Sequence, residues 1–352
     1  MSGDNSTIRE RFQSIVAGRS DRPLVAVWNT APFLNALAGV DLKTYYYHSR
    51  TKLRVQLEFQ DRFPDVFCLP GIWADFGALA EPSAFGCRID WPEKGMPMAQ
   101  PVLTTREKVL QVRPPDPGRE GLLDQALADY GFFWENLDKR YIEEYGYLDG
   151  VAASFGPVEL AAVLMGHGSF FIHLVSDPGL VHHLLKVTTE FVIRWLEAQE
   201  KANGPLKRIA LADHLPGQIS QDHFEEFWRP YTGQVIARWP EATLLYHNEY
   251  PIPYPRALAG LGIDVFHFGG PLGPLKTALG GEMTLMGNLE PVSLLLSASP
   301  REVFEEAGRV LEEGQAGGRF LLSSGGGLAP ETTEENVAAM VRAGEGRVPG
   351  KD

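Results

Sequence analysis

The sequence contains 352 residues with a formal net charge of −13, 44% hydrophobic and 22% charged residues, which is an ordinary globular composition. The acidic balance argues against nucleic acid and an anionic membrane surface as main partners. The two cysteines, Cys68 and Cys87, exclude a disulfide scaffold and a zinc site made of cysteine alone. No run reaches the roughly 18 apolar residues of a spanning helix, and no signal-peptide core opens the chain. We therefore expect a cytoplasmic enzyme with no membrane partner.

Short apolar runs alternate with amphipathic helical segments along most of the chain. This pattern is typical of parallel strands joined by crossover helices. The strand candidates are near-continuously apolar, as strands buried on both faces are. Eight of them are expected, at residues 24–28, 65–69, 150–155, 208–212, 243–247, 263–268, 283–287 and 319–323.

Helix start signals stand between these runs. A helix is predicted over 178–203, because Asp177 is a good N-cap residue and proline follows it. The spacing of Ser299 and Glu302 is that of a capping box and predicts another helix. Thr332 is expected to open the last helix in the same way.

Eight strands with helices between them predict an α/β fold, a (β/α)8 TIM-type barrel that forms a single domain over residues 1–352. Residues 1–20 are expected to form a leading N-terminal helix. Residues 70–147 are expected to be an extended insertion after strand two, with a helix at about 120–143. A doubly wound open sheet with a small second domain is the alternative.

Polar side chains follow several predicted strands, where the active sites of such barrels lie. His214, His247 and His267 stand at the ends of three consecutive strands, and Glu249 lies two residues after His247, on the same side of an extended segment. Imidazole and carboxylate together suit Zn²⁺ or another first-row divalent metal. The alternative is a set of separate histidines, each hydrogen-bonded around a polar pocket.

Two carboxylates, Asp75 and Asp213, also fall at the expected mouth of the barrel. Such a pair can do acid/base work or bind a polar group of a substrate. N-cap and turn roles explain them equally well.

Several segments, in order, resemble motifs of the uroporphyrinogen decarboxylase superfamily. The C-terminal motif reads GLAPETTEEN, against GI-x-P-x-T-x-x-EN in the superfamily. Residues 75–86 resemble its segment after strand two, and residues 156–166 its GP-x-x-x-A-x-x-x-x-G segment. Residues 219–231 resemble its "IS…F…F..PY" helix, and residues 287–291 its GNLDP strand end. The C-terminal motif lies at 327–336. The resemblance spans about 65–345 and implies a (β/α)8 barrel.

True decarboxylases of this superfamily carry an Arg-rich N-terminal motif that grips the carboxylates of a tetrapyrrole. This chain has no arginine between Arg22 and Arg50, so a polyanionic substrate would be poorly held. The chain is therefore more similar to the branch of corrinoid-dependent methyltransferases than to true uroporphyrinogen decarboxylase.

Thiol-activating members of that branch resemble zinc enzymes that use an H-x-C pair after strand five and a cysteine in the C-terminal glycine motif. This chain keeps His247 but has Glu249 and Gly326 in place of the two cysteines. A metal site without thiolates has only hard nitrogen and oxygen ligands, and it favours a substrate that binds the metal through oxygen. We expect the metal site to be rebuilt from His247, Glu249 and His267 or His214, or to be lost.

The resemblance implies methyl transfer between a small methylated substrate and a corrinoid protein that carries the cobalamin. A methyl ether is favoured over a thiol, with zinc or another divalent metal as Lewis acid. Asp75, Asp213 and Asn288 are expected to position substrate or supply protons. The expected pocket residues are Trp28, Asn29, Trp73, Phe155 and Tyr246. A metal-independent decarboxylase-type lyase acting on a small acid and a non-catalytic binding barrel are the alternatives.

Overall fold

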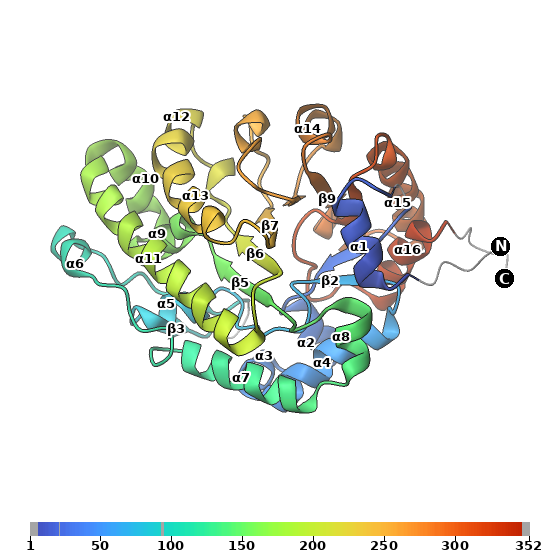
Figure 1. The fold of residues 1–352 in the computed structure, drawn as a ribbon, viewed down its shortest axis with the longest axis horizontal. Coiled ribbons are helices and arrows are strands. Elements are labelled where there is room, and N and C mark those ends of the chain that lie inside the picture. The colour runs from blue at the N-terminus through green and yellow to red at the C-terminus, as the bar shows by residue number, and fades with distance from the viewer. Residues whose placement is uncertain (1–5, 21, 93–94, 347–352) are drawn as a thin grey trace.

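The computed structural model describes residues 6–20, 22–92 and 95–346, in which eight parallel strands follow one another in chain order around a barrel (Figure 1). All eight predicted strands are present. Six form one sheet in sequence order, the other two pair with each other, and a bridge between Val25 and Leu322 joins the two groups. The strands are β1 (Ala26–Trp28), β2 (Phe67–Leu69), β5 (Val151–Phe155), β6 (Arg208–Ala212), β7 (Thr243–Asn248), β8 (Val265–Phe268), β9 (Thr284–Leu289) and β10 (Phe320–Ser324).

Among the described residues, β2 and β5 are not hydrogen-bonded to each other, so the barrel wall is interrupted there. Side chains satisfy the backbone groups on both edges of this gap. The amide of Gln199 donates to the carbonyl and accepts from the N–H of Ala153, at 3.0 Å each. Asn203 donates to the carbonyl of Val151 at 2.9 Å, and the Tyr147 hydroxyl accepts from a backbone N–H of β2. Buried backbone groups are thereby paired without a ninth strand.

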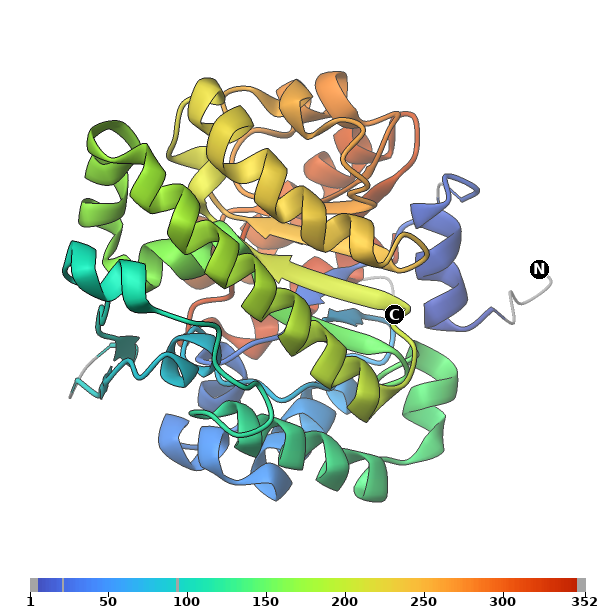
Figure 2. The same ribbon diagram turned by 60° about the vertical axis from the view of Figure 1, so that its left-hand side comes forward.

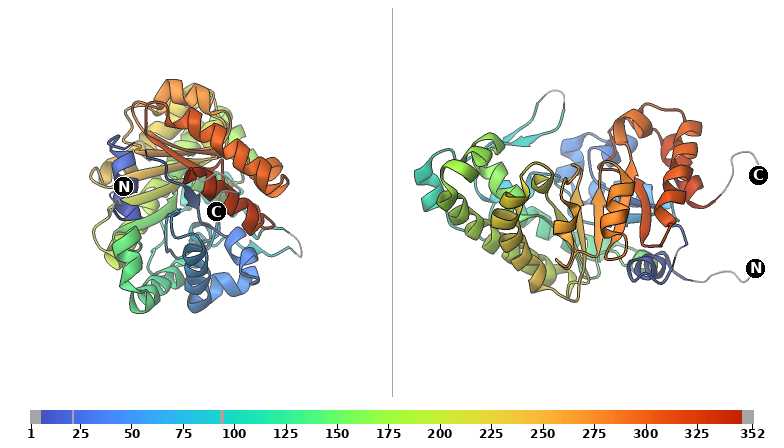
Figure 3. Two further views of the ribbon diagram at one scale, coloured as in Figure 1. Left: turned by 90° about the vertical axis from the view of Figure 1, so that its right-hand side faces the viewer. Right: turned by 90° about the horizontal axis from the view of Figure 1, so that it is seen from above.

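The connection from β2 to β5 contains several elements of its own. Its antiparallel hairpin, β3 with β4, projects from the body of the molecule (Figure 3). The predicted helix at 120–143 is in fact two helices, because Asp138 accepts from the backbone N–H of Arg140 and caps the second one. The elements are α5 (Ala80–Ala84), β3 (Ile89–Asp90), β4 (Met98–Ala99), α6 (Arg106–Gln111), α7 (Leu123–Asn136) and α8 (Lys139–Tyr145).

Helices cover the outside of the barrel, where α11 and α13 lie side by side (Figure 2). The helix predicted from residue 178 is confirmed, with Asp177 accepting from Leu180 N. The capping box of Ser299 and Glu302 is also formed. The last helix, however, is capped by Thr333 rather than by Thr332, since the Thr333 hydroxyl accepts from the N–H three residues on.

The remaining elements begin and end as follows: α1 (Ile8–Val16), α2 (Phe33–Leu37), α3 (Leu42–Tyr47), α4 (Ser49–Arg62), α9 (Pro157–Met165), α10 (His167–Ser176), α11 (Pro178–Asn203), α12 (Gln221–His223), α13 (Arg229–Arg238), α14 (Leu272–Leu279), α15 (Pro300–Gln315), α16 (Glu334–Gly344), and the single turns η1 (Leu215–Gly217), η2 (Phe224–Trp228), η3 (Pro255–Leu258) and η4 (Pro291–Leu296). No single helix among the described residues has the length and apolar character to cross a membrane. One pair, α9 and α10, passes that test together by length and composition only, across a bend of 105°.

A buried ion pair joins α4 to α7. Nζ of Lys52 lies 2.5 Å from a carboxylate oxygen of Asp129, and both side chains are fully buried. Ser49 and Gln125 donate to the other oxygen of Asp129. The same ammonium lies 3.5 Å from the centre of the Phe76 ring, a favourable cation–π geometry.

Candidate metal centre

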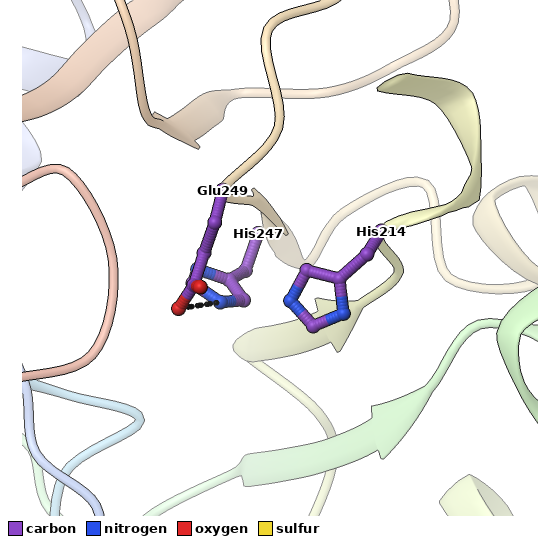
Figure 4. Close-up of side chains that lie close together, drawn as sticks. All are labelled: His214, His247 and Glu249. Carbon is purple, nitrogen blue, oxygen red and sulfur yellow. Dashed lines mark ion pairs between the residues drawn. The ribbon is translucent and has the colours of Figure 1, made fainter. Parts of the chain in front are cut away.

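Three side chains meet where β6 and β7 end: His214, His247 and Glu249 (Figure 4). Parallel pairing aligns Ala212 of β6 with His247 of β7, so the residues after both strands emerge at the same edge of the barrel. One potential ligand atom from each of the three side chains lies within 4.8 Å of the other two. Nε2 of His247 is 3.4 Å from Oε1 of Glu249. The sequence-based prediction of neighbouring strand ends thus corresponds to a real cluster.

His267 lies behind this cluster rather than in it. Its Nε2 is 2.9 Å from the carbonyl oxygen of Ser324, which can only accept, so Nε2 carries the proton. Its Nδ1 then accepts the Nδ1–H of His247 at 2.8 Å. The sequence places His267 among the candidate ligands, but both of its ring nitrogens are engaged. It orients His247 instead, as residues around metal ligands commonly do.

This hydrogen-bond chain leaves the lone pair of His247 Nε2 facing the carboxylate of Glu249. A proton or a cation between these two acceptors, 3.4 Å apart, would relieve the repulsion of their lone pairs. Burial lowers the pKa of His247, which disfavours the proton. In addition, Nε2 of His214 is buried and has no hydrogen-bond partner among the described residues. Two imidazoles and one carboxylate with an open fourth position fit a divalent first-row metal.

A buried carboxylate that the sequence did not single out, Glu159, supports His214. It accepts from the backbone N–H of His214 at 2.8 Å and lies 3.7 Å from Nδ1 of the same residue and 3.3 Å from Nε2 of His167. Burial alone would raise the pKa of Glu159, but its contacts with the two histidines outweigh burial and lower the pKa to about 2. Glu159 therefore stays ionised and holds the His214 ring. Its place in the first turn after β5 is the signal that could have found it.

A cavity of about 290 Å³ opens beside the three ligand candidates. Trp28 stacks on His247, with ring centres 4.4 Å apart and planes 6° from parallel. Trp28, Trp73 and Phe155 line the cavity, as the sequence predicts. Further aromatic side chains, not expected from the sequence, complete the wall: Phe76, Tyr130 and Trp195. Apolar walls with a few polar groups are typical of small-molecule sites.

Two residues expected in the pocket lie outside its lining. Asn29 is buried and donates to the carbonyl of Gly71 at 2.7 Å. Tyr246 is also buried, and its hydroxyl donates to the carbonyl of Asp213 at 3.1 Å. Both side chains thus stabilise the strand ends rather than face the cavity.

Asp75 is likewise absent from the cavity wall. Its carboxylate accepts from the backbone N–H groups of Ala31 and Gly77 and from the Tyr45 hydroxyl. These contacts are those of a turn-stabilising carboxylate, the second of the two roles that the sequence allows.

The side chains of Asp213 and Asn288 also form hydrogen bonds to other groups of the protein. Asp213 accepts from the indole N–H of Trp228 at 2.8 Å and from the backbone of Leu215 at 3.0 Å. Burial raises the pKa of Asp213 to about 8. Asn288 donates to the carbonyl of Gly270. Neither side chain lines the cavity.

Glu81 and Ser154 provide further polar groups in the wall of the cavity. Glu81 accepts from the backbone N–H of Phe155 at 3.1 Å, and within the described part of the chain no Lys or Arg forms an ion pair with it. Burial raises the pKa of the Glu81 carboxyl. The buried Ser154 hydroxyl lies next to the Glu81 carboxyl, and its interaction with that carboxyl lowers the pKa of Glu81 by less than burial raises it.

The substitution Glu81→Gln is expected to stabilise the protein increasingly as pH rises above 4.5, the ordinary pKa of a glutamate. Above that value the unfolded wild type releases the proton that the folded state retains, so wild-type stability falls by at most about 1.4 kcal/mol per pH unit from this group. Urea unfolding of both proteins at a series of pH values measures the difference. Parallel stability curves would show that Glu81 ionises normally in the folded state.

Comparisons with known proteins agree with this architecture. A family model described as uroporphyrinogen decarboxylase (URO-D) matches residues 11–346. The uroporphyrinogen decarboxylase of Methylobacillus flagellatus is 24% identical over 326 residues, 88% of this chain and 84% of that protein. The one from Albidiferax ferrireducens is 28% identical over 190 residues, which is about half of either chain (48% and 49%). A methyltransferase structure from Methanosarcina mazei matches 97% of this chain and 99% of its own length, with a TM-score of 0.80 and 20% identity, and shares the fold.

Proposed function

Since the chain belongs to the uroporphyrinogen decarboxylase family, we propose that it is the methyltransferase variant of this fold and moves a methyl group between a small methylated substrate and a corrinoid protein. The observation that carries the proposal is the cluster of His214, His247 and Glu249 at the edge of an aromatic cavity. No Lys or Arg occurs among the described residues that line this cavity, which disfavours a polyanionic tetrapyrrole.

Different residues of this site would bind the metal, position its ligands and exclude water. His214, His247 and Glu249 would hold a divalent metal, which supplies Lewis acidity at the atom that carries the methyl group. Trp28 keeps His247 in place by stacking. The aromatic walls exclude water from the methyl group, and a ligand set without thiolate suits a methyl ether better than a thiol.

Elemental analysis tests the metal, and a methyl-transfer assay tests the reaction. Purified wild type is expected to hold about one divalent ion per chain and to demethylate a methyl ether with cob(I)alamin as acceptor, followed by the cobalamin absorption spectrum. The His247→Ala/Glu249→Ala double variant should be folded, free of metal and inactive.

The matched control is another His–Glu pair of the same chain. His182 and Glu226 lie 3.5 Å apart on the outside of the barrel, so His182→Ala/Glu226→Ala should keep both metal and activity. A wild type without metal would refute the Lewis-acid site and favour a metal-independent lyase or a binding protein. Metal without any methyl transfer would refute the reaction alone.

A further inference from the structure

The Glu249 carboxylate rests directly over Gly326. A methyl group on Gly326 would lie 2.7 Å from the carboxyl carbon of Glu249 and 2.8 Å from its Oε1, closer than side-chain atoms approach one another. The next residue, Gly327, donates its backbone N–H to the same oxygen at 2.9 Å. The glycine loop after β10 therefore provides both the space and a hydrogen bond for this carboxylate.

Space, not backbone conformation, is the reason for glycine here. Gly326 is not among the glycines with positive φ, so any residue could adopt its backbone angles. The loop is also fixed, because the buried Ser324 hydroxyl donates to the Gly326 carbonyl at 2.6 Å. A side chain at position 326 would thus have to displace Glu249 rather than the loop.

Glu249 has room to leave. Its side chain is 44% exposed, whereas that of His247 is 4% exposed. A half-exposed carboxylate gains solvation and rotamer freedom when it turns outward. Two features allow the Glu249 carboxylate to lie 3.4 Å from His247. The lack of a side chain at Gly326 leaves room for it, and the N–H of Gly327 donates a hydrogen bond to it.

We infer that Gly326 is the residue that makes Glu249 a metal ligand, and so sets a thiolate-free site of two imidazoles and one carboxylate for a first-row divalent ion. Neither cysteine of the chain belongs to the cluster. Gly326 is a positioning residue, since it acts only through Glu249. The inference rests on the metal centre of the proposed function but not on methyl transfer.

The test is zinc affinity, measured by competition with a chromogenic chelator, in a cycle of Gly326→Ala and Glu249→Ala. Gly326→Ala is expected to weaken zinc binding at least tenfold. In the Glu249→Ala background the same substitution should change affinity less than twofold, because the ligand that it displaces is already absent.

Gly308→Ala is the matched control. This glycine lies on α15, away from the cavity, and a methyl group there would meet no atom within 4 Å, so zinc affinity should stay within twofold of wild type. Thermal unfolding of each metal-free variant separates misfolding from loss of a ligand.

Wild-type affinity in Gly326→Ala would overturn the inference. An equal loss in both backgrounds would also overturn it, because Gly326 would then act independently of Glu249. A wild type that binds no zinc refutes the inference together with the metal centre, whereas an unaltered Gly326→Ala leaves the proposed function standing.

Discussion

Replacing Asp129 with alanine is expected to lower the free energy of unfolding by about 3–5 kcal/mol, the cost of breaking a buried ion pair. The substitution leaves the ammonium of Lys52 in a fully buried position without its carboxylate. Burial already lowers the pKa of Lys52, since the interior disfavours its charge. Ser49 and Gln125 would lose their acceptor at the same time. Urea unfolding followed by circular dichroism measures the loss.

Two further variants show whether the unpaired charge causes the effect. Lys52→Met/Asp129→Leu removes both charges and should recover much of the stability, because buried pairs can be replaced by apolar groups of similar volume. Arg54→Ala breaks the exposed pair with Glu58 on the same helix and should cost less than about 0.5 kcal/mol. A small loss in Asp129→Ala would mean that the ammonium of Lys52 reaches water when it is released.

Replacing His267 with phenylalanine is expected to lower zinc affinity by about 10–100-fold although all three proposed ligands remain. The variant removes the acceptor for the Nδ1–H of His247, so the ring is free to change tautomer and to turn away from Glu249. The measurement is again competition with a chelator, with thermal unfolding of the metal-free protein as the test of folding.

The conservative variant His267→Asn distinguishes a hydrogen-bonding role from a packing role. Its side-chain oxygen can stand where Nδ1 of His267 accepts from His247, so part of the zinc affinity should return. If the His267→Phe variant binds zinc as tightly as the wild type does, the tautomer of His247 is set by something other than His267.

The strands were predictable because each is an apolar run buried on both faces, a signal that does not depend on partners far away in the chain. The observed β6, for example, has the same limits as its prediction. Helix ends were less predictable, since adjacent residues compete as caps. Thr333 rather than Thr332 caps α16, and Asp138 starts a new helix within the stretch predicted as one.

Some residues of the candidate site could also be predicted from the sequence, and others could not. His214, His247 and Glu249 could be found because parallel strands bring their ends together. The position of Glu159 after β5 marks it only as a candidate, and its contact with His214 and the space at Gly326 were not predictable, since each depends on a contact between segments far apart in the chain. Position after a strand also does not tell which way a side chain points, and none of five residues expected at the site lines the cavity: Asp75, Asp213, Asn288, Asn29 and Tyr246.

The interruption between β2 and β5 bears on how such a protein acquires new substrates. Along this part of the barrel the wall consists of side chains, among them Gln199 and Glu81, which bond to the edge of β5 and also line the cavity. Elsewhere, a wider or narrower barrel would require a new register between whole strands. Here a single substitution can reshape the wall, provided that the new side chain still pairs the backbone groups of β5, so divergence in substrate range among relatives should be concentrated at these positions.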